Sequence, residues 1–373
     1  MGNFAVMYLE KLSLINFKNY EEAELNFCPD VNCFSGDNGV GKTNLLDAIH
    51  YLSFCKSFFN PVDSQNILHE APFFVIQGQF DMDGVKEEIY CGQKRNQKKQ
   101  FKRNKKEYTR LADHIGLLPC VMMSPSDTEL IYEGSEERRK FIDSIISQFD
   151  REYLEDLISY NKVLMQRNAL LRNFGDNNYF DAPSLEVWDL QLINFGNNIY
   201  KKRQEFIAHF IQLFREHYKF ISDDKEEVSI RYESQMHHGD LKVLLEASLR
   251  KDRAVEYTTN GIHKDDIHFE MGGYPIKKIG SQGQQKSLLV SLRLAQFDYV
   301  KRQKNVKPIL LLDDIYDKLD ETRVRKLMEL VSSHRFGQIF ITDTNSDRIK
   351  KLFKGIDTEL KIFRVEKGSV QKV

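Results

Sequence analysis

The sequence predicts an α/β fold in which a mixed β-sheet with an antiparallel β meander carries an inserted, mainly helical lobe. Three observations predict it. A glycine-rich segment, GDNGVGKT, lies at 36–43, a long helical pattern runs from 136 to about 220, and an apolar strand ending in two carboxylates follows at 309–314. The glycine-rich segment and the carboxylate strand are both features of nucleotide-binding sheets. The α/β domain is therefore expected to be split, with folding bringing its two parts together.

The N-terminal region has the alternating pattern of antiparallel strands. Residues 8–35 alternate apolar and polar side chains, and strand patterns continue at 73–80 and 85–92. The last strand of the first group, 31–35, leads directly into the glycine-rich segment. After that segment, apolar residues recur at helical spacing, at Leu45, Leu46, Ile49 and Leu52. The sequence thus predicts a strand, a tight loop and a helix whose N-terminus faces the loop.

The glycine-rich segment fits the phosphate-loop pattern G-x-x-x-x-G-K-[ST] without a mismatch. Its glycines allow the tight turn that aims backbone N–H groups at an anion. Lys42 places a positive charge on the β- and γ-phosphates, and Thr43 offers its hydroxyl to Mg²⁺. We therefore expect ATP and Mg²⁺ as cofactors. The predicted nucleotide-binding residues of this loop are Gly36, Asp37, Asn38, Gly39, Val40, Gly41, Lys42, Thr43 and Asn44.

The apolar run Ile309–Leu312 indicates a buried parallel strand that ends in Asp313 and Asp314. At such a strand end one acid can hold the metal while the next orients the attacking water. We assign Asp313, with Thr43, to the metal, and Asp314, with Lys42, to catalysis. A surface turn rich in acids is the alternative interpretation, and the phosphate loop disfavours it.

The middle of the chain predicts helices, and its end predicts more strands and helices. Apolar residues step by four from Phe141 to Leu157, and a loop at 173–183 separates two helices of an antiparallel pair. A strand is predicted at 226–234, a helix at 239–253 capped by Asp240, and a hairpin turning at 272–273. Helices at 284–302 and 322–333 and a strand at 338–342 complete the pattern. The predicted domains are 1–124 and 251–373 for the α/β domain and 125–250 for the lobe.

Composition indicates a reduced, cytoplasmic protein that does not enter membranes. The 373 residues are 41% hydrophobic and 29% charged, with a net charge of −1, and no apolar stretch has the length of a membrane span. The five cysteines are odd in number and form no CxxC pair, so a disulfide framework or a metal site is not expected.

One segment concentrates positive charge. The run from Lys94 to Arg110 carries nine Lys or Arg residues against one acid, Glu107. It fits either a hairpin that contacts nucleic-acid phosphates or a solvated hairpin, and the pattern alone does not decide between them. Our candidate DNA contacts are Lys98, Lys102 and Lys105.

The segment Ser281-Gln282-Gly283-Gln284, placed just before a helix, resembles the signature motif of ABC-type ATPases. This resemblance implies an ABC-type P-loop ATPase head. In that family the motif of one head caps the γ-phosphate held by the other head, so two heads close on ATP. A serine hydroxyl, a glycine N–H and a helix N-terminus suit a second anion site. The resemblance thus assigns Ser281 a catalytic role in trans and adds Ser281, Gly283 and Gln284 to the nucleotide-binding residues.

Along nearly its full length the chain resembles the RecF family, bacterial recombination-mediator ATPases related to SMC heads. The matching segments are LINFKNY (14–20), GDNGVGKTNLLDAIHYL (36–52), SPSD (124–127), ERRKFID (137–143), LMQRNALL (164–171), GIHKDDI (261–267), SQGQQKSLLVSLRLAQ (281–296) and LLLDDIYDKLD (310–320). The resemblance implies a weak DNA-stimulated ATPase that binds gapped or junction DNA as an ATP-dependent homodimer. It also implies cooperation with RecO and RecR in loading RecA, and a role in DNA repair, replication and the SOS response to DNA damage.

Two segments depart from the patterns of related families, and one remains unassigned. The D-loop, usually SELD, has the sequence Asp317-Lys318-Leu319-Asp320 here, so its contact across the dimer is in question. The switch histidine of transporter ATPases is absent after the last core strand. Either Asp343 or Thr344 takes its place, or turnover is slow, and we expect slow turnover. In GIHKDDI, His263 and Lys264 fit either ligand contacts or a structural role.

Three other functions were weighed against the expected ATP-driven DNA switch. They are an ABC transporter subunit, a DNA scaffold with a vestigial ATP site, and an ABC-type nuclease. The inserted lobe and missing histidine argue against the transporter. The complete set of Lys42, Thr43, Asp313 and Asp314 argues against a vestigial site. The short stretch after 342 argues against an appended nuclease domain.

Overall fold

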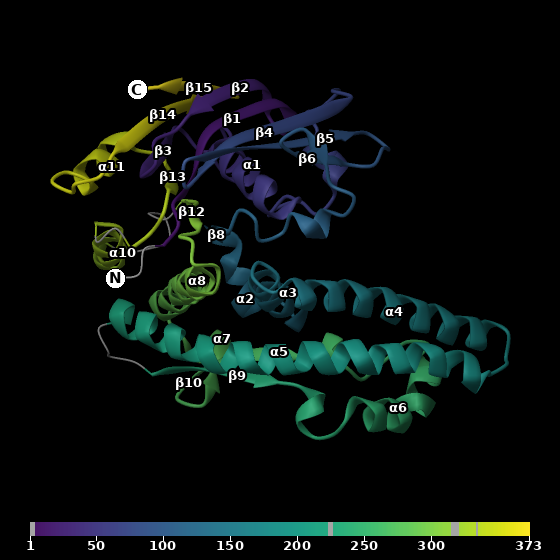
Figure 1. The fold of residues 1–373 in the computed structure, drawn as a ribbon. Coiled ribbons are helices and arrows are strands. Elements are labelled where there is room, and N and C mark those ends of the chain that lie inside the picture. Colours follow the sequence, from purple (N-terminus) through teal and green to yellow (C-terminus); the bar gives the residue numbers. More distant parts are fainter. Residues whose placement is uncertain (1–3, 223–226, 315–320, 333–334) are drawn as a thin grey trace. The chain divides into compact units, whose positions relative to one another are not determined.

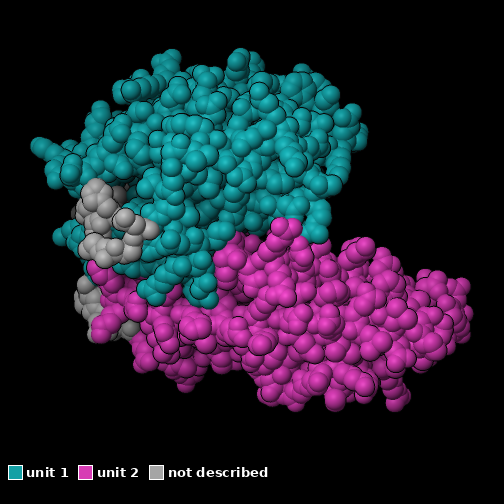
Figure 2. Space-filling view, in the orientation of Figure 1, with its two compact units in different colours: residues 1–127, 286–373 teal, residues 128–285 magenta. Residues whose placement is uncertain are grey.

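The computed structural model describes residues 4–222, 227–314, 321–332 and 335–373. They form two compact units, unit 1 with residues 1–127 and 286–373 and unit 2 with residues 128–285 (Figures 1 and 2). The chain leaves unit 1 after its first strands and returns to it later, as expected for a split α/β domain with an inserted lobe. Residues 251–285, assigned from sequence to the α/β domain, group with unit 2. The predicted domain limits themselves stay a prediction.

The first sheet of unit 1 is antiparallel and contains the predicted meander. Its strand order among the described residues is β2-β1-β4-β5-β6-β7, with neighbours antiparallel. Between Phe73 and Phe80, buried positions along β4 alternate with less buried ones, as expected for a sheet with one face on the core. The strands are β1 (Met7–Phe17), β2 (Tyr20–Asn26), β4 (Phe73–Met82), β5 (Val85–Lys94), β6 (Gln100–Arg103) and β7 (Lys106–Glu107).

The second sheet of unit 1 is largely parallel and carries the nucleotide-site motifs. Its order among the described residues is β15-β14-β3-β13-β12-β8, and only β15 runs antiparallel to its neighbour. The predicted extension of the meander to residue 35 was wrong. Strand β3 is buried at all five positions and pairs in parallel on both sides, as strands covered on both faces do. The strands are β3 (Val31–Ser35), β8 (Cys120–Met123), β12 (Ile309–Leu312), β13 (Ile339–Asp343), β14 (Leu360–Glu366) and β15 (Ser369–Lys372).

This topology brings three chain segments to one edge of the parallel sheet. Strand β13 lies between β3 and β12, with Ile341 opposite Cys33 on one side and Leu312 on the other. The carboxyl ends of the three strands therefore meet, which is where open α/β sheets bind ligands. Helix α1 (Lys42–Phe54) contacts strands of both sheets, and its apolar residues join them in one hydrophobic core.

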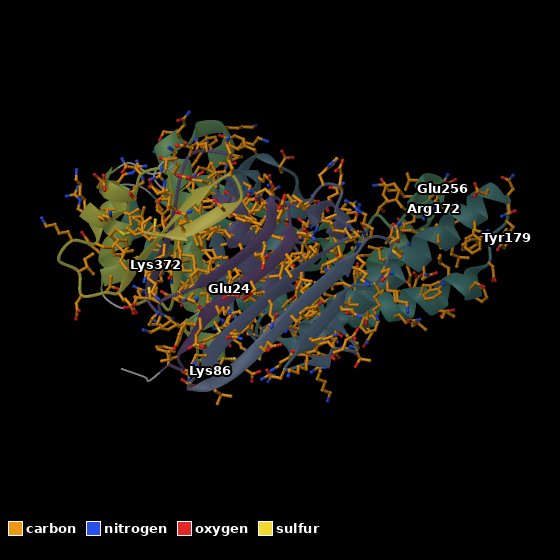
Figure 3. All side chains as sticks on the ribbon, turned by 90° about the horizontal axis from the view of Figure 1, so that it is seen from above. Glu24, Lys86, Arg172, Tyr179, Glu256 and Lys372 are labelled. Atoms are coloured by element: carbon orange, nitrogen blue, oxygen red, sulfur yellow. The ribbon has the colours of Figure 1, made fainter. Side chains whose placement is uncertain are left out.

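Unit 2 is built on a long helical pair. Helix α4 (Arg151–Asp176) packs along α5 (Ala182–Ser222). Two shorter helices, α2 (Glu129–Tyr132) and α3 (Ser135–Ile146), precede the pair in the chain. The pair was predicted, but its turn is shorter than the predicted loop at 173–183, because α4 continues to Asp176. Tyr179 lies on this turn, at the end of the pair (Figure 3).

The rest of unit 2 follows the sequence expectations closely. Strand β9 (Val228–Glu233) pairs with β10 (Asp266–Met271), which turns back into β11 (Tyr274–Pro275) at the predicted glycine pair. Helix α6 (Leu241–Val255) is capped by the predicted Asp240, whose side chain accepts from the backbone N–H of Lys242 at 3.0 Å. A short helix, α7 (Ile276–Ile279), follows where the hairpin was expected to continue.

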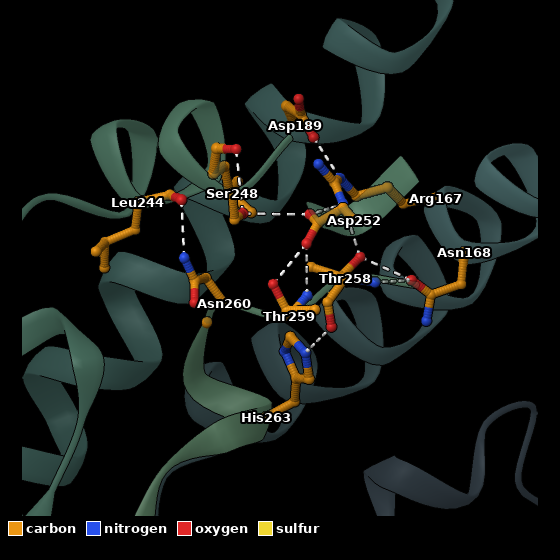
Figure 4. Close-up of polar contacts among 12 residues, drawn as sticks. Arg167, Asn168, Asp189, Leu244, Ser248, Asp252, Thr258, Thr259, Asn260 and His263 are labelled. Carbon is orange, nitrogen blue, oxygen red and sulfur yellow. Dashed lines mark hydrogen bonds and ion pairs between the residues drawn. The ribbon is translucent and has the colours of Figure 1, made fainter. Parts of the chain in front are cut away.

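Two buried arginines tie the elements of unit 2 together. Arg167 of α4 donates to Asp252 at 2.8 Å and to Thr258 at 2.9 Å (Figure 4). Arg203 of α5, 1% exposed, donates to Asp265 at 2.7 Å and to Asp143 at 2.9 Å. Charged groups this deeply buried persist only when they are paired and hydrogen-bonded.

The GIHKDDI segment has a structural role within unit 2. One His263 ring nitrogen lies 2.8 Å from the Tyr160 hydroxyl. The other lies 3.1 Å from the Thr258 carbonyl oxygen (Figure 4). Burial lowers the pKa of His263 to about 4, so the ring is neutral near pH 7. Its two nitrogens are thus both engaged in holding the loop.

Within the part of the chain that the structure describes, no helix is both long and apolar enough to cross a bilayer. All five cysteines are buried, as small apolar side chains commonly are.

Candidate nucleotide site

The phosphate loop connects β3 to α1 through two glycines that require the left-handed region of φ. Gly39 has φ 79° and Gly41 has φ 111°, values that side-chain-bearing residues rarely adopt. A Cβ atom on Gly41 would also lie 2.7 Å from Asn19 Oδ1, whereas Gly39 has open space around it. Gly41 is therefore required for both its conformation and its close approach to Asn19.

A turn between the first two strands holds the loop from outside. Asn19 Nδ2 donates to the Val40 carbonyl at 2.9 Å, and Asn44 Nδ2 donates to Asn19 Oδ1 at 2.7 Å. The Tyr20 hydroxyl donates to the Gly41 carbonyl at 2.9 Å. Neither Asn19 nor Tyr20 is predicted from sequence to belong to the site. They occur in the LINFKNY segment, whose match to the RecF family is the one signal that points to them.

Lys42 already holds its charge inside the loop. Lys42 is 4% exposed, and its Nζ donates to the carbonyl oxygens of Gly36 and Asp37, both at 2.8 Å. An ammonium group centred on loop carbonyls is placed for the point-charge contact with phosphate oxygens that was predicted for Lys42.

The structure brings the two predicted metal ligands together. Thr43 Oγ1 lies 2.9 Å and 3.1 Å from the carboxylate oxygens of Asp313, although 270 positions separate the residues. Thr342 at the neighbouring strand end also donates to Asp313, at 2.8 Å. A hydroxyl and a carboxylate at hydrogen-bond distance fit a hard, oxygen-seeking cation such as Mg²⁺. Such an ion takes its other ligands from phosphate and water.

Burial sets the electrostatics of Asp313. The residue is 5% exposed, and burial raises its pKa above the ordinary value, while the bonds from Thr342 and Thr43 act in the opposite direction. A nearby cation would restore the charged form, because opposite charges favour ionisation. Among the described residues no group of three or more His, Cys, Asp or Glu is arranged to hold a metal.

Asp314 follows in a strained conformation. Its φ is 46°, and its backbone N–H donates to Thr342 Oγ1 at 2.8 Å. This left-handed residue turns the chain sharply away from the strand. The D-loop residues 317–320 lie outside the described residues.

Asp343, one of the two residues predicted as replacements for the switch histidine, is held by several contacts. Asp343 ends β13 beside the phosphate loop, and its carbonyl accepts from the Gly36 N–H at 3.2 Å. Its Oδ1 accepts from the Arg348 guanidinium at 2.8 Å and from the Asn345 N–H at 2.6 Å. Thr344 is exposed. Asp343 is thus the more closely packed of the two predicted replacements.

The SQGQ segment forms a capping box at the start of α8 (Gln282–Lys304). Ser281 Oγ accepts from the Gln284 N–H at 3.3 Å, and Gln284 Oε1 accepts from the Ser281 N–H at 2.6 Å. Ser281 is exposed at this helix start. Ser281, Gly283 and Gln284 belong to unit 2 and the phosphate loop to unit 1, so each is described within its own unit.

The basic segment is less strongly charged than its composition indicates. It forms β6 and β7 of the antiparallel sheet, with a turn at Asn104 and Lys105. Lys99 pairs with Asp63 and Arg103 pairs with Glu87. Among the three predicted DNA contacts, Lys98 and Lys105 are exposed, and Lys102 is half-buried with its ammonium 5.3 Å from the Tyr90 ring centroid.

Comparison with known proteins places the chain. The RecF/RecN/SMC N-terminal domain family matches residues 8–371. A DNA replication and repair protein RecF from Phocaeicola vulgatus is 55% identical over 366 residues, covering 98% of each chain. A structure of the recombination mediator protein RecF with ATPrS in the RecFOR pathway has TM-score 0.89 and 30% identity, and covers 100% of both chains. The corresponding structure with ATP has the same TM-score and identity and covers 99% of this chain and 98% of that one. With its parallel sheet, phosphate loop and inserted helices, this chain belongs to the RecF family of ABC-like, SMC-related ATPase heads.

Proposed function

We propose that this chain is an ATP-dependent DNA-binding protein of recombinational gap repair and replication-fork maintenance. ATP at the phosphate loop joins two copies into a homodimer, the dimer binds DNA at gaps or single-strand/double-strand junctions, and slow, DNA-stimulated hydrolysis releases it. The names of its relatives support the pathway, since they describe a DNA replication and repair protein and a recombination mediator of the RecFOR pathway.

One observation carries the ATPase proposal. The Thr43 hydroxyl and the Asp313 carboxylate lie 2.9 Å apart at one sheet edge, beside a lysine whose ammonium sits in the phosphate loop. Burial disfavours the charged form of the Asp313 carboxyl by raising its pKa, and a cation at this position would restore it, so the arrangement suits a site that binds Mg²⁺. The geometry therefore supports an active site over a scaffold.

Within this site each side chain has a proposed role. The backbone of residues 36–44 and the Lys42 ammonium bind the phosphates. Thr43 and Asp313 would hold Mg²⁺, which would supply positive charge to the phosphate oxygens. Asp314 orients the attacking water. We expect slow turnover, because Asp343 is engaged with Arg348 where transporter ATPases have a histidine.

Dimerisation is proposed to depend on the capping box at α8. The exposed Ser281 and the N–H groups of Gly283 and Gln284 would contact the γ-phosphate held by the second copy. Each copy thus supplies half of the other's site, and ATP binding and dimerisation are linked.

Partners and location complete the proposal. We infer that the dimer acts with RecO and RecR to load RecA at gaps during the SOS response to DNA damage. The protein then works in the cytoplasm, where the DNA is. Reduced, buried cysteines support a reducing compartment.

Light scattering with and without ATP tests the central step. We expect ATP to raise the mass of the wild type roughly twofold, because only the dimer completes both sites. Ser281→Arg should stay monomeric while it still binds ATP. A mass that ignores ATP would contradict the proposal. Retention of DNA by Lys42→Met would favour the scaffold with a vestigial ATP site.

Salt titration of DNA binding tests the basic segment. Reversing charge at Lys98, Lys102 and Lys105 should lower the slope of log affinity against log salt by about 0.9 for each DNA phosphate that a lysine no longer neutralises. The control reverses three exposed lysines elsewhere, so that net charge changes equally: Lys242, Lys251 and Lys367. An unchanged slope in the first variant, or an equal decrease in both, would remove the segment from the interface.

A further inference from the structure

A side chain next to the four-residue signature motif contacts the start of α8. Gln285, largely buried, follows the SQGQ segment directly. Its Nε2 donates to the Gly280 carbonyl at 3.1 Å, and its backbone N–H donates to the Ser281 carbonyl at 3.0 Å. Gln285 therefore holds the carbonyl groups on both sides of the Ser281 Cα atom.

The other end of the Gln285 carboxamide is held by a tyrosine far away in sequence. The Tyr132 hydroxyl donates to Gln285 Oε1 at 2.6 Å, across 153 positions. Tyr132 is 45% exposed, so burial of its ring is not the main contribution of this side chain. The hydroxyl is its specific contribution, because it orients an amide that could otherwise flip.

The short helix that carries Tyr132 is itself fixed from two sides. Lys277 Nζ donates to the Tyr132 carbonyl at 2.5 Å. The Arg138 guanidinium donates to the carbonyl oxygens of Leu130 at 3.2 Å and Glu133 at 2.8 Å. The side chains of Lys277 and Arg138 thus supply hydrogen-bond donors to backbone carbonyls in and just after α2. A four-residue helix has no internal partners for these carbonyls.

Arg138 is in turn held by the GIHKDDI segment. Its Nε and Nη2 donate to the two carboxylate oxygens of Asp266 at 2.7 Å and 3.0 Å. Such a bidentate pair is geometrically specific. Within unit 2, Asp266 thus holds Arg138, and Arg138 holds the backbone on either side of Tyr132. Tyr132 in turn contacts Gln285.

We propose that Tyr132 and Gln285 are positioning residues that hold the Gly280–Ser281 backbone in the geometry that contacts the second copy's phosphate. The inference rests on the proposed role of Ser281 in trans and extends it to residues that touch no nucleotide. Without the Tyr132 hydroxyl the Gln285 amide loses its fixed orientation, and Ser281 samples positions that do not complete the site. ATP binding by the phosphate loop itself is unaffected.

The test compares Tyr132→Phe and Gln285→Leu with wild type, by the dimer Kd in saturating ATP and by the monomer's Kd for ATP. Tyr132→Phe should raise the dimer Kd about fivefold, as expected for one net hydrogen bond of about 1 kcal/mol. The ATP Kd should not change, and the loss of one hydrogen bond should lower the thermal midpoint by only about 2 °C. Because both residues act through one contact, the double variant should be no weaker than Gln285→Leu alone.

Tyr257→Phe is a matched control. Tyr257 is also 45% exposed and also has a lysine near its ring, Lys264 at 5.1 Å compared with Lys277 at 5.8 Å for Tyr132. No hydrogen bond of its hydroxyl is found among the described residues, so its removal should leave the dimer Kd unchanged.

Three outcomes separate the ideas. If the wild type dimerises with ATP and Tyr132→Phe has the same dimer Kd, the inference is overturned and the proposed function stands. Equal weakening in Tyr132→Phe and Tyr257→Phe, or a fall in ATP affinity that accounts for the weaker dimer, would also overturn it. A wild type that stays monomeric would overturn both.

Discussion

Replacing Gly41 by alanine should weaken ATP binding by about two to three orders of magnitude. A residue with a side chain at φ 111° carries about 1–2 kcal/mol of backbone strain. The new Cβ atom would displace the Asn19 amide, which holds Val40 and Asn44 through bonds of 2.9 Å and 2.7 Å. Breaking both bonds adds roughly 1 kcal/mol each, so the total is about 3–4 kcal/mol. Each 1.4 kcal/mol is about tenfold in affinity.

Gly39→Ala is the matched control for this prediction. Gly39 also has a positive φ, 79°, but its Cβ position has no neighbour within 4 Å. It should therefore carry the strain alone and weaken binding about tenfold. The difference between the two variants isolates the contact with Asn19.

Isothermal titration with ATP measures both variants, with circular dichroism to confirm folding. In an Asn19→Ala background the clash disappears, so Gly41→Ala should then cost only its backbone strain, about tenfold. An equal loss of ATP affinity in Gly41→Ala and Gly39→Ala would refute the reasoning. So would a Gly41→Ala penalty that stays the same in the Asn19→Ala background.

Three further predictions concern buried ionisable side chains. Arg203→Met should lower the free energy of denaturant unfolding by about 3–5 kcal/mol, because it leaves Asp143 and Asp265 without their buried partner, and a decrease below about 1 kcal/mol would contradict this. Burial lowers the pKa of His114 from 6.5 to about 4, so the unfolded chain binds an extra proton between these values and stability falls as pH drops through them. His114→Gln should remove up to about 3 kcal/mol of that fall, measured by unfolding at pH 7 and pH 4, and an unchanged slope would count against the assignment. Asp313→Asn should abolish the Mg²⁺ enhancement of ATP binding while metal-free binding persists, and a retained enhancement would exclude Asp313 as a ligand.

Some features of the site could be predicted from local sequence. The phosphate loop needs glycines, a lysine and a threonine at fixed offsets, and the strand before Asp313 needs an unbroken apolar run, so both are visible without any tertiary contact. Helical spacing likewise predicted α1, α4 and α5, because a 3.6-residue repeat is a property of the element itself. Element ends, such as the turn after Asp176, were placed less accurately, since capping and packing decide them.

Other features depended on pairing that the sequence does not encode locally. The alternation of residues 8–35 suggested one meander, but whether β3 joined the antiparallel or the parallel sheet was decided by burial on both faces. The charge around the 94–110 run also depends on distant residues, because Asp63 and Glu87 pair with Lys99 and Arg103 from other segments of the chain.

The sequence by itself determined that a phosphate-binding loop and a carboxylate strand exist in this chain, since each is specified by residues within a few positions of one another. Only the tertiary structure decided which distant side chains support them: Asn19 and Tyr20 at the loop, Thr342 at Asp313, and Tyr132 at Gln285. The physical reason is that a hydrogen bond needs two atoms within about 3 Å. Across 20 to 150 positions of chain, only the packing of strands and helices sets that distance.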